Sequence, residues 1–143
     1  MDDPLYNRDI LRLAAATAAP ERLPAPDITV VRDSLTCGSR ITVDLTVDGD
    51  RVTGYGHAIQ ACAIGQAAAA MVGRNAPGQT FEQISDFRDA MYRMLSSGEL
   101  ANGPDDWPEL PVFAVVHHHP ARHEASLLAL DAILEARDRL AAS

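Results

Sequence analysis

The spacing of apolar residues along the chain changes from helical to alternating and back to helical. Residues 5–19 carry apolar side chains at helical spacing and predict an N-terminal helix. Prolines end this helix, so we expect an extended linker over residues 20–26. From residue 41 to residue 47, apolar residues alternate with Thr and Asp. This period of two predicts a strand with one buried face and one wet face.

Two further strands flank this one in the predicted sheet. A β-branched run over residues 28–32 precedes it, and the turn signal Asp48-Gly49-Asp50 follows it. The chain then returns as a third strand over residues 51–59. We therefore expect three antiparallel strands joined by two tight connections.

The second half of the chain predicts helices. An Ala-rich helix begins at Cys62, and a capping box at Thr80-Phe81-Glu82-Gln83 begins another that ends near Gly98. A loop over 98–111 and a short apolar segment, 112–116, precede a last helix over 121–141. The fold class is thus α+β: an N-terminal helix, a three-stranded antiparallel sheet, then three helices packed on one face. We expect one domain that spans residues 1–143.

Composition narrows the possible functions. The chain has 143 residues, with 12 Lys+Arg against 20 Asp+Glu and a net charge of −8. This charge disfavours non-specific binding to nucleic acid or to anionic membranes. Every cationic residue is Arg, and the lack of Lys excludes Schiff-base chemistry and a Walker-type phosphate loop. The N-terminus shows no signal-peptide pattern, so we expect a cytoplasmic protein with reduced thiols.

The two cysteines are the candidates for chemistry. Cys37 lies in a predicted tight loop beside Gly38, and Cys62 lies at the first turn of the Ala-rich helix. A helix N-terminus favours the reactive thiolate. The alternative is that both are small buried hydrophobic residues, as free cysteines often are.

Three segments of residues 35–71 form a distinctive set: Thr36-Cys37-Gly38 before a strand, Val47 to Val52 across a hairpin, and Cys62 to Ala67 at a helix start. With these segments, residues 35–71 resemble the NifU/IscU/SufU family of iron–sulfur cluster assembly scaffolds. Leu5-Tyr6 and Pro120-Ala121-Arg122 also match, so the resemblance spans nearly the whole chain. The long connection over 72–116 is most similar to the SufU-like branch. The resemblance implies a SufE/NifU-like fold, a cysteine desulfurase as sulfur donor, and iron–sulfur acceptor proteins as partners.

The chain departs from the family at the expected ligands. Ser39 stands where the family usually has Asp, Ala61 stands where it usually has Gly, and Ala125 aligns with its third Cys. The resemblance therefore leaves two thiolates. Imidazole can complete such a set, and His123 at the start of the last helix is the best third donor. Glu124 beside it is a harder oxygen donor, less suited to a cluster.

We accordingly expect Cys37, Cys62 and His123 to bind metal and cofactor. The alternative for His123 is a surface residue at a helix end. For the run His117-His118-His119 we favour a solvated surface tract; on a strand, its first and third rings would share one face. His57 is expected to pack in the core or at its rim. Trp107 is expected to cover an apolar face.

Three functions fit these features. The first is a non-enzymatic scaffold that holds a transient [2Fe–2S] cluster, receives sulfur as a persulfide on Cys37 or Cys62, and passes the cluster to acceptors. The second is a zinc-dependent sulfurtransferase, which the SufU branch resembles. The third is a degenerate paralogue that binds no metal and acts as an interaction partner.

Overall fold

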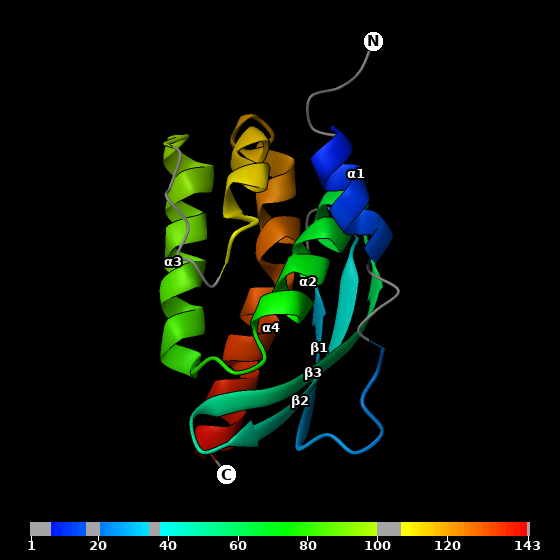
Figure 1. Cartoon of the computed structure of the whole chain (residues 1–143), viewed down its shortest axis with the longest axis vertical. Coiled ribbons are helices and arrows are strands. Elements are labelled where there is room, and N and C mark those ends of the chain that lie inside the picture. Colours follow the sequence, from blue (N-terminus) through cyan, green and yellow to red (C-terminus); the bar gives the residue numbers. More distant parts are fainter. Residues whose placement is uncertain (1–6, 17–20, 35–37, 100–106, 143) are drawn as a thin grey trace.

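The computed structural model describes residues 7–16, 21–34, 38–99 and 107–142. Within these ranges, five helices and three strands are arranged in two layers, and a short helical turn precedes the last helix (Figure 1). In chain order, the elements are α1 (Arg8–Ala15), β1 (Ile28–Asp33), β2 (Arg40–Asp48), β3 (Arg51–Gln60), α2 (Ala63–Asn75), α3 (Phe81–Ser97), η3 (Leu110–His118), η4 (Pro120–Arg122) and α4 (His123–Ala142). The predicted α+β order is confirmed.

The three strands form one antiparallel sheet in the order β1-β2-β3. Val43 at its centre pairs with Val30 on one side and with His57 on the other. Side chains alternate between the faces of a strand, so Ile41, Val43 and Leu45 of β2 point to the helical layer, where they are buried. Gly49 adopts φ 61° in the β2–β3 turn, a conformation that glycine permits. The predicted hairpin is confirmed.

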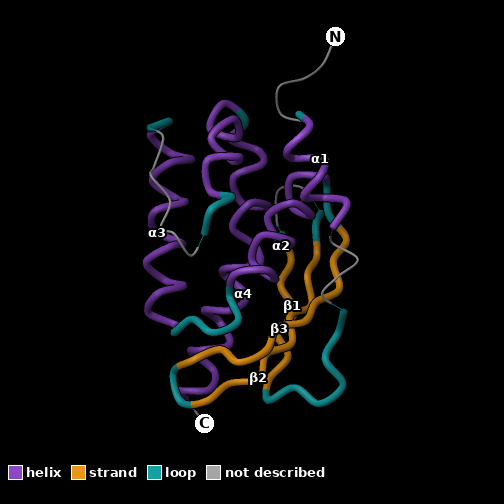
Figure 2. Tube along the Cα trace, in the orientation of Figure 1, coloured by secondary structure: helices purple, strands orange, loops and turns teal. Residues whose placement is uncertain are grey.

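The helices cover the inner face of the sheet (Figures 1 and 2). Helix α4 packs against β1 and β2, while α2 packs against β3 and α4. Helix α1 lies on α2, and α3 lies against α4. The capping box of α3 forms as predicted, because Thr80 Oγ1 accepts from Gln83 N and the Gln83 side chain accepts from Thr80 N.

The outer face of the sheet is covered in part by the linker between α1 and β1. Residues 21–26 belong to no helix or strand, with bends at residues 24 and 25, and Leu23 lies over Gly54 and Gly56 of β3. A Cβ atom at Gly56 would lie only 2.8 Å from Leu23 N, so only glycine permits this approach. The alternating pattern predicted a wet outer face, and that expectation is wrong at Asp44, which is fully buried beneath this linker.

Asp44 fixes the linker through four hydrogen bonds. Its carboxylate accepts two from the Arg22 guanidinium, one from Leu23 N at 3.1 Å, and one from Thr29 Oγ1 at 2.6 Å. Burial raises the pKa of Asp44, but these donors outweigh it and hold the pKa below its ordinary value. Asp44 thus joins the linker to two strands of the sheet.

The segment between α3 and α4 differs most from the prediction. Residues 112–116 belong to the 3-10 helix η3, and they do not form a strand on which alternate histidines would share a face. Leu110, Phe113 and Val116 are buried at a spacing of three, which places them on one side of a 3-10 helix. Trp107 is buried and stacks on Phe87, with ring centroids 3.9 Å apart, so it is a core residue.

The predicted first helix is longer than the observed one. Asn7 Oδ1 caps α1 by accepting a hydrogen bond from Ile10 N, and the helix ends at Ala15. Residues 5, 6 and 17–19 of the prediction lie outside the described residues. No described helix is long and apolar enough to cross a lipid bilayer.

Candidate metal centre

Three parts of the chain meet at one end of the molecule. In Figure 1, α2 and α4 both begin near the upper end, where β1 ends and β2 begins, and Figure 2 shows the same arrangement. Cys62 lies at the start of α2, His123 lies at the start of α4, and the β1–β2 connection joins the two strands. We call this region, formed by two helix starts and a loop, the centre.

Cys62 is the N-cap residue of α2. Its backbone is extended (φ −64°, ψ 170°), and its carbonyl oxygen accepts from Gln66 N at 3.0 Å. Its thiol is free, half-buried, and makes no capping hydrogen bond. The helix start thus positions this thiol, and no capping hydrogen bond uses it. Cys62 is not fully buried, but it packs against the hydrophobic core, so its roles as ligand and as packing residue both stay predictions.

The first turn of α2 packs closely against α4. A Cβ atom at Gly65 would lie 2.8 Å from Ala61 Cβ and 3.6 Å from Ala125 Cβ. Ala125 is 1% exposed. The position that aligns with the third family cysteine therefore adjoins the first turn of α2, and here it offers a methyl group.

The β1–β2 connection is tied to the start of α4. Ser34 N donates to the Ser39 carbonyl oxygen at 2.8 Å, and Ser34 Oγ donates to Glu124 Oε1. Both serines are buried. Sequence reasoning missed this contact because its partners lie 90 residues apart. Cys37 lies outside the described residues, so its place in the centre remains a prediction.

His123 is the first residue of α4 and is half-buried. Its Nε2 atom lies 3.1 Å from the Val116 carbonyl oxygen and 3.2 Å from that of His117. The ring is therefore bonded to η3. Within the described ranges, no group of three or more Cys, His, Asp or Glu side chains is arranged to hold a metal ion. Cys62 begins α2 and His123 begins α4, with its ring directed to η3, so their convergence on one metal ion and their role as ligands remain predictions.

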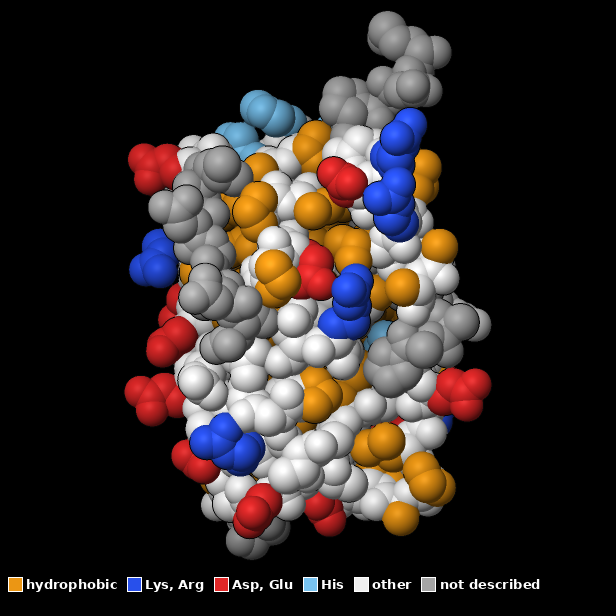
Figure 3. Space-filling model, viewed as in Figure 1, with side chains coloured by type: hydrophobic (Ala, Val, Ile, Leu, Met, Phe, Trp, Pro, Cys, Tyr) orange, Lys and Arg blue, Asp and Glu red, His pale blue; other side chains and the backbone are white. Residues whose placement is uncertain are grey.

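The remaining histidines differ in their contacts and in their exposure to solvent. Figure 3 shows histidine side chains gathered at the upper end of the molecule. The Nδ1 atom of His117 lies 2.6 Å from the Leu95 carbonyl oxygen, and His118 is exposed, so the solvated-tract prediction is wrong for His117. His57 is buried, with Nδ1 2.8 Å from Tyr55 Oη, which confirms the core prediction. Burial also raises the pKa of Tyr55.

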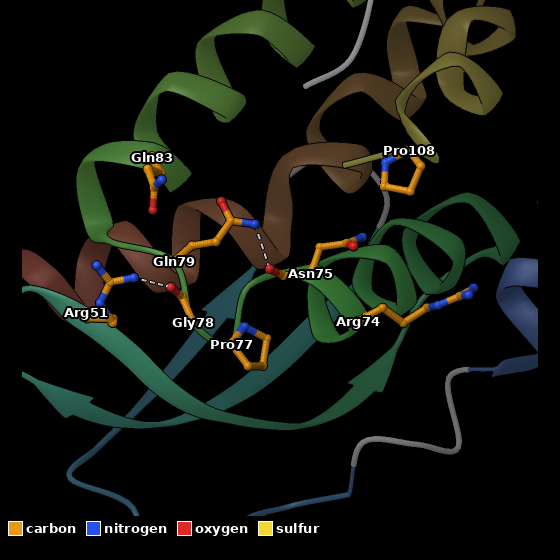
Figure 4. Close-up of a pocket in the computed structure, with 8 residues that line it drawn as sticks. All are labelled: Arg51, Arg74, Asn75, Pro77, Gly78, Gln79, Gln83 and Pro108. Atoms are coloured by element: carbon orange, nitrogen blue, oxygen red, sulfur yellow. Dashed lines mark hydrogen bonds between the residues drawn. The ribbon is translucent and has the colours of Figure 1, made fainter. Parts of the chain in front are cut away.

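A pocket of about 500 Å³ lies at the opposite end of α2 (Figure 4). Arg51 and Arg74 stand on opposite sides of it, with Arg51 bonded to the Gly78 carbonyl oxygen. Gln79 Nε2 donates to the Asn75 carbonyl oxygen across its floor. The 13 residues of α2 span roughly 20 Å. This pocket is therefore separate from the centre that contains Cys62.

Two solved structures share this architecture. The crystal structure of a nitrogen-fixing NifU-like protein (N-terminal) from Brucella abortus matches with a TM-score of 0.83 and 36% identity, over 93% of this chain and 92% of that one. An iron–sulfur cluster assembly scaffold protein for the SUF system from Fervidobacterium islandicum matches with a TM-score of 0.81 and 19% identity, over 90% and 93% of the two chains. No family model and no curated protein matches the sequence.

The architecture establishes the fold class of the protein, and the sequence identity establishes its family. The helix, three antiparallel strands and following helices form the NifU-like α+β fold. The identity to the Brucella protein, across nearly the full length of both chains, shows the family. The chain belongs to the NifU/IscU/SufU family of iron–sulfur cluster assembly scaffolds. The resemblance read from the sequence is confirmed.

Proposed function

We propose that this protein is an iron–sulfur cluster assembly scaffold that binds iron and a transient [2Fe–2S] cluster as its cargo. Cys37, Cys62 and His123 bind the cargo, and the protein then releases it to acceptor proteins in the cytoplasm. One observation carries the proposal: the half-buried free thiol of Cys62 stands where the starts of α2 and α4 meet. Membership of the scaffold family supports it.

The chemistry of the donors fits this cargo. Thiolates are the usual ligands of iron–sulfur clusters, and imidazole replaces thiolate in some of them. Two thiolates and one imidazole leave the cargo incompletely held by the protein, which favours release. A scaffold needs that property, whereas a permanent cluster site does not.

Sulfur arrives from a cysteine desulfurase. A cysteine thiolate of the scaffold attacks the terminal sulfur of the desulfurase persulfide. A new S–S bond forms on the scaffold, and the desulfurase cysteine leaves as a thiolate. An external electron donor supplies two electrons for each persulfide sulfur that enters the cluster as sulfide. The scaffold holds the product without turning over a substrate, so we do not class it as an enzyme.

Two other functions compete with the scaffold. A zinc-dependent sulfurtransferase would hold a single zinc ion with the same donors, but Ser39 and the buried methyl group of Ala125, at the aligned positions of the family Asp and third Cys, count against it. Alternatively, the centre could hold no metal and the protein act as a degenerate interaction partner. Zinc accepts sulfur and nitrogen donors in tetrahedral geometry, so two cysteines and a histidine are chemically competent.

Metal analysis separates the three functions. The protein is purified without oxygen, then incubated with ferrous iron, sulfide and a thiol reductant. Iron, zinc and sulfide per chain are measured together with the visible absorption spectrum. We expect iron and sulfide in equal amounts and a brown colour. Zinc alone, at one ion per chain, would establish the sulfurtransferase instead. No metal under any preparation would overturn the scaffold and favour the degenerate partner.

A further inference from the structure

We propose that η3 holds His123 as the tautomer with hydrogen on Nε2, so that Nδ1 is the atom that binds the metal of the cargo. The tautomer follows from hydrogen bonds of the described residues. The role of Nδ1 as a ligand rests on the function proposed above. The two parts are tested separately below.

The tautomer is fixed by the partners of Nε2. Both atoms near it, the Val116 and His117 carbonyl oxygens, are hydrogen-bond acceptors with no hydrogen to donate. Nε2 therefore carries the hydrogen and shares it between them. In a neutral imidazole with hydrogen on Nε2, the lone pair lies on Nδ1.

The sequence around η3 explains why the His117 carbonyl oxygen is available, whereas the Val116 carbonyl oxygen also accepts from His119 N at 2.9 Å. A 3-10 helix that continued past residue 117 would give the His117 carbonyl oxygen a donor from the backbone of residue 120. Residue 120 is proline, which has no backbone N–H. The Nε2–H group of His123 bonds to this oxygen instead. Pro120 and His123 thus work together at the junction of η3 and α4.

This arrangement decides which nitrogen can bind a metal ion. Binding through Nε2 would remove its hydrogen and break both bonds to η3. Binding through Nδ1 leaves both bonds in place. Histidine ligands in proteins commonly donate their second N–H to a carbonyl or carboxylate, which orients the ring. In this chain, η3 supplies those orienting oxygens before any metal is bound.

The tautomer is tested on the metal-free protein by NMR. Long-range proton–nitrogen correlations of 15N-labelled protein at about pH 8, where imidazole is neutral, distinguish the two nitrogens. We expect Nε2 to be the protonated nitrogen of His123 and Nδ1 the unprotonated one. Hydrogen on Nδ1 would overturn the inference, whatever cargo the protein binds.

The ligating atom is tested by adding Zn²⁺, a diamagnetic probe, to the same sample. We expect the Nδ1 resonance of His123 to shift and Nε2 to keep its hydrogen. If Zn²⁺ binds and Cys62→Ser abolishes that binding while the His123 nitrogens are unchanged, only this inference fails. If wild-type protein takes up neither Zn²⁺ nor iron, the assignment of Nδ1 and the proposed function both fail.

Two substitutions separate the nitrogens chemically. The amide nitrogen of Gln reaches the place of Nε2, whereas the side chain of Asn reaches only the place of Nδ1. His123→Gln should keep the melting temperature and weaken Zn²⁺ binding by about tenfold or more. His123→Asn should lower the melting temperature because its side chain does not reach the carbonyl oxygens of η3. His118→Gln, at an exposed neighbour, is the matched control and should change neither quantity. Unchanged Zn²⁺ affinity in His123→Gln would contradict the assignment of Nδ1.

Discussion

The centre around Cys62 and the outer face of the sheet around Asp44 hold their polar groups in opposite ways. Asp44 is fully buried, and its carboxylate accepts hydrogen bonds from three residues. Cys62 is half-buried with a free thiol, and the neighbouring position 125 offers only a methyl group. The carboxylate of Asp44 thus has hydrogen-bond partners within the fold, whereas the thiol of Cys62 remains available to a ligand. The framework is therefore fixed by contacts that need no cargo, so we expect release of the proposed cargo to leave the domain folded.

Cys62→Ser should break the centre and leave the framework intact. Serine is a favoured N-cap, so α2 keeps its start, and the free energy of unfolding should change by less than about 1 kcal/mol. Iron and sulfide uptake should be lost, because a hydroxyl is a much poorer ligand than a thiolate. Metal analysis and urea unfolding of the same preparations measure both quantities. Uptake equal to that of wild type would remove Cys62 from the centre.

Asp44→Asn should destabilise the framework and leave iron uptake intact. Removing the charge leaves the Arg22 guanidinium and neighbouring donors poorly satisfied, and we expect a loss of about 2–4 kcal/mol in the free energy of unfolding. Iron uptake per folded chain should be unchanged. The matched control is Asp33→Asn, which breaks an exposed ion pair with Arg40 and should change the free energy of unfolding far less. Equal losses of unfolding free energy in the two variants would show that the buried contact stabilises the fold no more than the exposed ion pair does.

Ala125→Cys should give the centre an additional thiolate and hold the proposed cluster more tightly. A thiol at this position adjoins the first turn of α2, beside Gly65, which carries no side chain. We expect bound cluster to be lost about tenfold more slowly, equivalent to roughly 1.4 kcal/mol. The decay of visible absorption after adding a chelator measures the rate. Ala129→Cys, one turn further along α4, also places a buried thiol and should leave the rate unchanged.

The pH dependence of stability should show the smallest effect. Because the pKa of Asp44 is lowered in the folded protein, its contribution is fully present above the ordinary value of 3.8 and is lost as pH falls through the lowered pKa. The difference in unfolding free energy between wild type and Asp44→Asn should be constant from about pH 7 to pH 4.5 and shrink below about pH 3.8. A difference that stays constant to pH 2.5 would contradict the lowered pKa.

Local signals predicted most of the fold. The alternation in β2, the turn at Gly49 and the capping box at Thr80 each depend on residues within one element. The start of α2 at Cys62 was found for the same reason. Period, turn chemistry and capping are short-range effects, so a single sequence carries them.

Contacts between distant segments could not be predicted in this way. The sequence around Arg22 carries no signal of a contact with the sheet, and the alternation in β2 predicts that Asp44 is solvent-exposed. Asp44 is buried only because the linker that carries Arg22 covers it. Ser34 and Glu124 gave no signal of their contact for the same reason. The 3-10 helix was missed because Val112, Val115 and Val116 favour strands, whereas the buried spacing of three only becomes visible once the core is known.

The single tryptophan gives the protein its own optical reporter. Trp107 stacks on Phe87 of α3, and its indole N–H donates to Gln79 Oε1 at 2.9 Å, between the helices and away from the thiol. Its fluorescence should therefore follow the opening of the helical layer rather than the loading of the centre. Stability and occupancy can then be recorded as separate signals from one cuvette, without attaching a dye.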